Sequence, residues 1–157
     1  MWSETAAAAG RTDVDKHDIV LQEEFKLANE LTDEIMKADH IVIATPMHNW
    51  GPPSALKAWF DRIINYRTFY SREEQLTDTQ ITLIVSSGGP YSMVDALKSQ
   101  DFLRPWLSFV LQKIGAQEKN IKFVNCDPTG RDVNAAWERA RSMIPDAIER
   151  EHRSSEL

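Results

Sequence analysis

Apolar residues in this chain follow two patterns, short continuous runs and longer stretches with helical spacing. The continuous runs occupy residues 40–46, 80–86 and 120–126. Such runs are typical of strands that are buried on both faces, as in parallel sheets. We therefore predict strands near residues 41–45, 80–86 and 121–125, all parallel to one another.

The stretches between these runs have the spacing of amphipathic helices. In residues 17–37, for example, apolar residues recur at steps of three and four positions, which places them on one helical face. We predict three further helices: one that Pro52 and Pro53 open and that extends to about Ile64, one over residues 102–114 and one over residues 133–151. We expect Gly115 to cap the helix of residues 102–114. We expect Trp137 to face inward from the helix of residues 133–151.

Helices that alternate with strands in this way predict an α/β fold. Crossovers of this length between parallel strands are right-handed and place helices on both faces of the sheet, which makes three layers. A chain of 157 residues is normally one domain, and we see no repeat or linker that would divide it. We therefore treat residues 1–157 as a single domain.

Composition narrows the classes of function. The net charge is −6 and there is no dense Lys/Arg run, which argues against nucleic acid and anionic membranes as partners. No run approaches the roughly 20 apolar residues of a membrane helix, and the first residues do not resemble a secretory signal. Cys126 is the only cysteine, so no intrachain disulfide can form, which fits the cytoplasm.

Two loops are expected at the carboxyl edge of the sheet, where open α/β sheets bind ligands. They are residues 46–51, "PMHNWG", and residues 86–92, "SSGGPYS". Met47, Trp50 and Tyr91 can pack on a flat aromatic ligand. Polar contacts can come from Asn49, from the backbone around His48, and from Gly88 and Gly89. The loops therefore suit a planar heterocycle with polar edges.

Simpler interpretations of the same residues stay open. Met47 and Trp50 are as well explained by core or interface packing, and the Gly88–Gly89 pair by an ordinary turn. His48 has no second metal-binding residue at the right spacing, so we expect no metal site. No Ser-His-Asp or Cys-His set marks a catalytic side chain. From residue types and spacing alone we infer an α/β domain with a candidate site for an aromatic ligand, and nothing more specific.

A longer segment is more specific. "ADHIVIATPMHNWGPPSALKAWFDRI" resembles the FMN-dependent NADH:quinone oxidoreductases, or azoreductases, of the flavodoxin-like superfamily. In that family a strand ends in Pro-Met-aromatic-Asn-aromatic and is followed by a Pro-Ser-x-Leu-Lys helix. The later "RTF" at residues 67–69, the "SSGGPYS" loop and "FLRPWLSFVLQKIGAQEKNIKFV" also resemble family segments. The resemblance covers nearly the whole chain.

The resemblance implies a flavodoxin-like fold and a two-electron oxidoreductase. FMN would carry a hydride from NAD(P)H to a quinone or an azo compound, and no protein side chain would act as a nucleophile. It also implies a homodimer. The residues that it places around the flavin ring are Pro46, Met47, His48, Asn49, Trp50, Ser86, Ser87, Gly88, Gly89 and Tyr91.

The chain departs from the family pattern at its start. The family begins with a strand, a Ser-containing phosphate loop and a helix, and the resemblance finds none of these here. We therefore expect an N-terminally truncated sheet, an unprotected edge at the strand near residues 41–45, and FMN binding that is weakened or lost. Two smaller departures lie within the ring site: His48 replaces the usual Tyr or Trp, and Ser87 stands where many relatives have Arg.

Two classes of function follow from these features. In the first, the chain is an azoreductase-type flavoenzyme, with its start codon placed too late or with tolerance of the loss. In the second, it is a non-catalytic remnant that acts as a dimerisation or partner-binding module. Retention of the ring-site residues favours descent from an enzyme.

Overall fold

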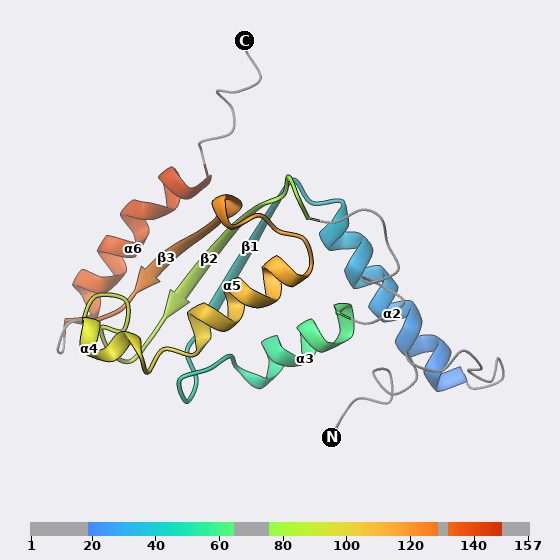
Figure 1. The fold of residues 1–157 in the computed structure, drawn as a ribbon, viewed down its shortest axis with the longest axis horizontal. Helices are drawn as coiled ribbons and strands as arrows, with labels where there is room; N and C mark the ends of the chain where they lie inside the picture. Colours follow the sequence, from blue (N-terminus) through green and yellow to red (C-terminus); the bar gives the residue numbers. More distant parts are fainter. Residues whose placement is uncertain (1–18, 65–75, 129–131, 149–157) are drawn as a thin grey trace, which may run out of the picture.

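The computed structural model describes residues 19–64, 76–128 and 132–148. Within them, a three-stranded parallel sheet lies between two layers of helices (Figure 1). Its strands are β1 (His40–Pro46), β2 (Gln80–Ser86) and β3 (Ile121–Cys126), in the order β1-β2-β3. The predicted parallel α/β fold is therefore confirmed, and each strand agrees with its predicted bounds to within one residue.

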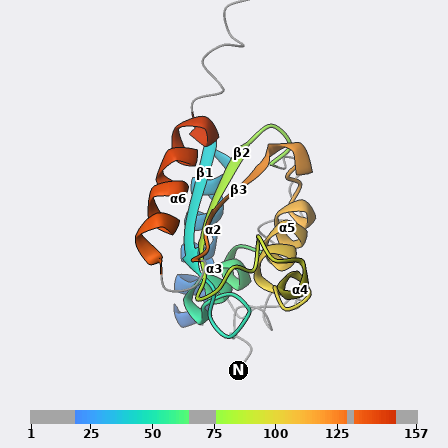
Figure 2. The same ribbon diagram turned by 90° about the vertical axis from the view of Figure 1, so that its left-hand side faces the viewer.

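The helices cover the two faces unequally. Figure 2 shows α6 on one side of the strands and α5 with α3 on the other. Helix α2 packs beside α3, and α6 packs on β3 and β2. The elements are α2 (Ile19–Met36), α3 (Ser54–Ile63), α4 (Asp95–Lys98), α5 (Leu103–Lys113), the 3-10 turn η2 (Glu118–Asn120) and α6 (Val133–Ile148).

The larger part of the core lies between the sheet and α3 and α5. Phe60 of α3 meets Trp106 of α5 edge to face, with ring centroids 5.3 Å apart. Leu103, Leu107 and Leu111 recur at helical spacing on α5 and are buried against the sheet. A smaller core lies beneath α6, where Ala136 and Ala140 pack with Val124 and Cys126. Small residues on α6 let the helix approach the sheet closely.

Strand β1 differs from our expectation that it is buried on both faces. Ile43 and Thr45 are buried, but Val42, directly before Ile43, is 50% exposed. The physical reason is its position: Val42 lies on the α6 side of the sheet, and α6 packs mainly on β3 and β2. β1 also pairs with β2 alone in the described part of the chain, which makes it an edge strand there.

The helices agree with the prediction except in two details. Trp137 of α6 is 52% exposed and does not face inward, because small alanines rather than the indole make the contact with the sheet. The short helix α4 follows the second loop and was not expected. The "RTF" segment and the predicted end of the last helix, residues 149–151, lie outside the described residues. No helix that the structure describes is long and apolar enough to cross a membrane.

Candidate functional site

All three strands end at the same level of the sheet, and this alignment brings the loops that follow them together. Pro46 pairs with Ser86, and Ser86 pairs in turn with Cys126. The loops that follow β1 and β2 therefore begin side by side at one edge of the sheet. This edge is the carboxyl edge, where ligands bind in open α/β sheets.

The loop after β1 makes a tight turn with an unusual backbone. His48 and Gly51 exchange two backbone hydrogen bonds, of 3.0 and 2.9 Å. Between them Asn49 (φ 47°) and Trp50 (φ 64°) both have positive φ, the pattern of a type I′ turn. Asn tolerates this conformation, whereas a bulky residue such as Trp adopts it rarely and at a cost. The structure therefore holds an indole in a conformation that its residue type disfavours.

Two hydrogen bonds fasten this turn to its neighbours. The Met47 N–H donates to the Ser86 carbonyl over 2.7 Å, and the Phe102 N–H donates to the Trp50 carbonyl over 3.0 Å. The Met47 side chain packs against the core, while Trp50 is 50% exposed. The loop is thus anchored through Met47 and presents Trp50 at its surface.

The loop after β2 is compact and folded on itself. The Tyr91 N–H donates to the Gly89 carbonyl over 2.9 Å, and a Cβ on Gly89 would meet the Tyr91 ring at 3.4 Å. A Cβ on Gly88 would meet nothing within 4 Å, so this glycine borders open space. The structure therefore brings the second predicted loop to the same edge as the first.

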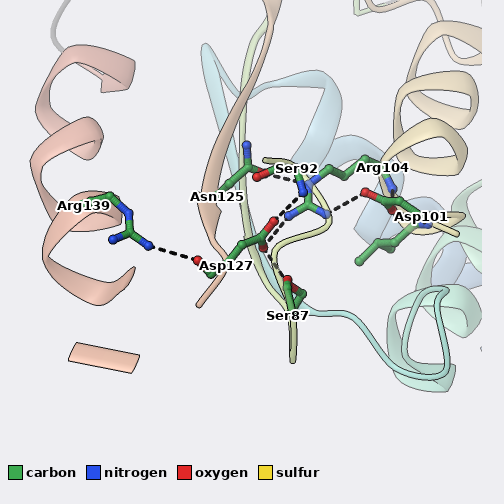
Figure 3. A network of polar contacts seen from close by, with 9 residues as sticks. Ser87, Ser92, Asp101, Arg104, Asn125, Asp127 and Arg139 are labelled. Carbon is green, nitrogen blue, oxygen red and sulfur yellow. Dashed lines mark hydrogen bonds and ion pairs between the residues drawn. The ribbon is translucent and has the colours of Figure 1, made fainter. Parts of the chain in front are cut away.

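The second loop rests on a buried carboxylate that sequence reasoning missed. Asp127, directly after β3, is fully buried. Its Oδ1 accepts from Ser87 Oγ and from Arg104 Nη2, both at 2.7 Å, and its Oδ2 accepts from the Ser92 N–H at 2.8 Å (Figure 3). Arg139 of α6 donates to the Asp127 carbonyl oxygen over 3.1 Å. The carboxylate therefore meets both ends of the 87–92 loop.

Arg104 links this carboxylate to the start of α5. Its guanidinium donates to Asn125 and to Asp101, each over 2.6 Å, as well as to Asp127. Asp101 in turn accepts the backbone N–H groups of Leu103 and Arg104, both at 3.0 Å, and so caps the helix. One sequence signal was available, because Asp127 follows an apolar strand and so belongs to the ligand-binding edge.

A cavity of about 420 Å³ adjoins the second loop on its α6 side. Its wall includes the buried Cys126, whose thiol pKa is raised above its ordinary value, chiefly by burial and also by the Asp127 carboxylate. The lining residues are Ser86, Ser87, Gly88, Cys126, Pro128, Val133, Ala136 and Trp137.

The backbone N–H groups of the two loops bear on the kind of ligand that this edge could bind. Within residues 19–64, 76–128 and 132–148, no protein group accepts from the N–H groups of Asn49, Trp50, Gly88 or Gly89. A planar heterocycle with acceptor atoms at its edge, such as the flavin ring, can satisfy these donors. The same described ranges contain no cluster of three His, Cys, Asp or Glu side chains placed to hold a metal ion.

Comparisons with known proteins agree with the observed fold. A family model described as a flavodoxin-like fold matches residues 2–144. An FMN-dependent NADH:quinone oxidoreductase of Thiobacillus denitrificans is 33% identical over 148 residues, which cover 91% of this chain and 70% of that protein. A protein of the same name from Pelagibacter ubique is 31% identical, over 79% of this chain and 64% of its own length.

Solved structures show the same fold. An FMN-dependent NADH-azoreductase from Bacillus anthracis, in complex with FMN, aligns with a TM-score of 0.77 at 20% identity, over 96% of this chain and 74% of that one. The azoreductase AzrA aligns with a TM-score of 0.70 at 18% identity, over 93% and 70%. On the family match and the sequence identities, this chain belongs to the flavodoxin-like family that includes the FMN-dependent NADH:quinone oxidoreductases.

Proposed function

We propose that the chain is an FMN-dependent NAD(P)H oxidoreductase that reduces quinones or azo compounds by two-electron hydride transfer. One observation carries the proposal: two loops with free N–H groups meet at the carboxyl edge, joined by the bond from Met47 to Ser86. The names of the relatives, which are FMN-dependent NADH:quinone oxidoreductases, support the same activity.

In this proposal the protein binds and orients the flavin ring, and the cofactor supplies the redox chemistry. When bound, FMN would supply the two-electron redox chemistry between NAD(P)H and the acceptor. The N–H groups of Asn49, Trp50, Gly88 and Gly89 would donate to the polar edge of the ring. The half-exposed indole of Trp50 and the ring of Tyr91 would offer flat apolar contact. Pro46, Met47, His48, Ser86 and Ser87 complete the proposed contact set.

We propose that the contacts described above serve the ring of FMN. Charge-assisted hydrogen bonds to a phosphate contribute about 1.5–3 kcal/mol each, so FMN that is held by its ring alone would bind more weakly, by powers of ten, than FMN that is also held by its phosphate.

A partner-binding module is the second candidate, and exposed apolar residues favour it. Phe102 and Phe109 are 65% and 58% exposed, and Val42 on β1 is half exposed. The same surfaces fit a homodimer of an active enzyme, which is the assembly that we propose.

We propose the cytoplasm as the location of the protein, because the free Cys126 suits a reducing compartment.

An anaerobic assay separates the two candidates. The purified chain is mixed with FMN, NADH and a naphthoquinone, and NADH oxidation is followed against FMN alone. An enzyme produces turnover that saturates with FMN and falls in Asn49→Ala, because alanine opposes the positive φ of this position and so disturbs the turn that presents the N–H groups. Turnover no faster than that of free FMN at saturating cofactor would contradict the oxidoreductase and leave the binding module.

A further inference from the structure

We propose that Asp127, held by Arg104, is a positioning residue that fixes the 87–92 loop in the conformation used for ring binding. The proposal rests on the proposed function, because it concerns the same site. It starts from the fact that Asp127 is fully buried and that its side chain accepts from two parts of one loop, Ser87 Oγ and the Ser92 N–H.

The contacts on the carboxylate close the loop at both ends. Ser87 and Ser92 flank Gly88, Gly89 and Tyr91, so one side chain restrains the segment that would border the flavin. The Ser87 Oγ also lies 2.6 Å from the Gly89 carbonyl. The hydroxyl has a single proton, which it donates to either the Gly89 carbonyl or the Asp127 carboxylate at a given moment. Both acceptors hold the hydroxyl between the loop and the carboxylate.

Arg104 connects this loop to the other one. Its guanidinium joins Asp127 to Asp101, which caps α5. The residue between Asp101 and Leu103 is Phe102, whose N–H binds the Trp50 carbonyl of the first loop. The start of α5 therefore holds both loops, one through Phe102 and one through Arg104 and Asp127. A shift of either contact would change the spacing between the two halves of the site.

Energetic considerations favour a positioning role over a purely stabilising one. Buried ion pairs contribute little net stability, because the cost of removing both charges from water offsets their attraction. Here the side chains of Arg104 and Asp127 are 12% and 0% exposed. We infer that this pair specifies one arrangement of the loop, a role that buried polar groups have in some proteins. The arrangement specified here is that of the loop with two free N–H groups.

Asp127→Asn tests the proposal without changing the size of the side chain. The amide keeps one acceptor oxygen but presents an NH2 group to at least one of the present donors, so the contact to Ser92 or to Arg104 becomes donor against donor. Arg104→Lys is the second variant, because it keeps the charge but cannot reach three partners in fixed geometry. Asn120→Ala is the matched control: Asn120 is a buried polar residue at the opposite edge of the sheet, bonded to Thr77 and Gln80.

Two readouts are compared in the 157-residue chain: hydrogen exchange of the Ser92 amide and the dissociation constants of FMN and riboflavin. We expect Asp127→Asn to speed Ser92 exchange and to weaken both flavins about tenfold, the value of one charge-assisted hydrogen bond. Arg104→Lys should shift both readouts in the same direction by less. Asn120→Ala should lower the unfolding temperature without changing either readout.

Several results would overturn the inference. Ser92 could stay protected in both loop variants, or the freed loop could bind flavin as well as the unaltered loop does. Equal effects of Asn120→Ala on flavin affinity would assign the loss to general destabilisation. Failure of the unaltered chain to bind any flavin would contradict the proposed function alone, because the exchange comparison still decides whether Asp127 orders the loop.

Discussion

Trp50 is the residue whose conformation most needs a functional explanation. Its φ of 64° costs an L-residue about 1–2 kcal/mol, yet its indole is half exposed and fills no core position. Backbone strain of this kind is concentrated at functional sites. Packing of the indole on a flat ligand would explain why a bulky residue occupies the second central position of a type I′ turn.

We therefore predict that Trp50→Gly makes the chain more stable and its flavin binding weaker. Glycine adopts positive φ freely, so the free energy of unfolding should rise by about 1 kcal/mol. Loss of the indole should raise the FMN dissociation constant several-fold, about 1 kcal/mol in binding. Chemical denaturation and flavin titration measure the two effects. A variant that gains stability and binds flavin unchanged would show that the indole has no part in the site.

The buried thiol of Cys126 makes the free energy of unfolding depend on pH. Burial and the Asp127 carboxylate raise the pKa of this thiol in the folded chain. The unfolded chain therefore releases the proton first, as pH rises through about 8.5, and stability is lost between that point and the higher folded pKa. The free energy of unfolding should fall more steeply from pH 8 to pH 10 in the unaltered chain than in Cys126→Ala. Parallel curves would show that the thiol makes no contribution.

At the scale of single elements, the end of α5 shows how a short sequence signal becomes structure. Gly115 has a φ of 99°, and its N–H donates to the Gln112 carbonyl over 3.1 Å. The next N–H, of Ala116, donates to the Leu111 carbonyl over 3.0 Å. These two bonds form the Schellman motif that closes many helices. Gly115 was predicted to cap this helix, and the structure confirms it.

Gly115→Ala should destabilise the chain by about 1 kcal/mol, because alanine has a Cβ that opposes positive φ. Gln112→Ala, an exposed position in the same helix, should change the free energy of unfolding by less than about 0.5 kcal/mol. Both are measured by denaturant unfolding. An effect of Gly115→Ala as small as that of the control would mean that the helix end relaxes without cost.

The sequence predicted the strands and helices well because each has a strong local pattern. Continuous apolar runs gave the strands, and helical spacing together with Gly115 gave α5. The two loops were placed correctly at one edge because parallel strands share their carboxyl ends. Local pattern failed where the outcome depends on distant contacts. Val42 lies on the α6 side of the sheet but on a strand that α6 does not chiefly contact, and Trp137 lies beside alanines that make the contact with the sheet.

The buried network of Ser87, Arg104 and Asp127 could not be predicted from local sequence patterns either, because it also depends on distant contacts. Arg104 and Asp127 are 23 positions apart, and Ser87 and Asp127 are 40 apart. Their residue types are common on solvated surfaces, and only the fold makes them neighbours. The left-handed backbone of Trp50 was equally hidden, because its residue type argues against that conformation.

For the whole molecule, the exposed aromatic residues of the α5 region predict self-association. Phe102 and Phe109 are two helical turns apart and therefore lie on the same side. An isologous contact would bury this side against its own copy. Light scattering at micromolar concentration should give twice the chain mass, and Phe109→Ser should shift it toward the monomer. The matched control is Trp137→Ser, an equally exposed aromatic on α6. A monomeric unaltered chain would contradict the homodimer.

The central claim is that the loops after β1 and β2 form a flavin-ring site. It is tested most directly by following the backbone amide resonances of the chain while riboflavin, and then FMN, is added. We predict saturable shifts concentrated at Asn49, Trp50, Gly88 and Gly89, with dissociation constants for the two flavins within about threefold of each other, because the ring rather than the phosphate makes these contacts. Shifts that are absent at millimolar flavin, or that map away from both loops, would contradict the account.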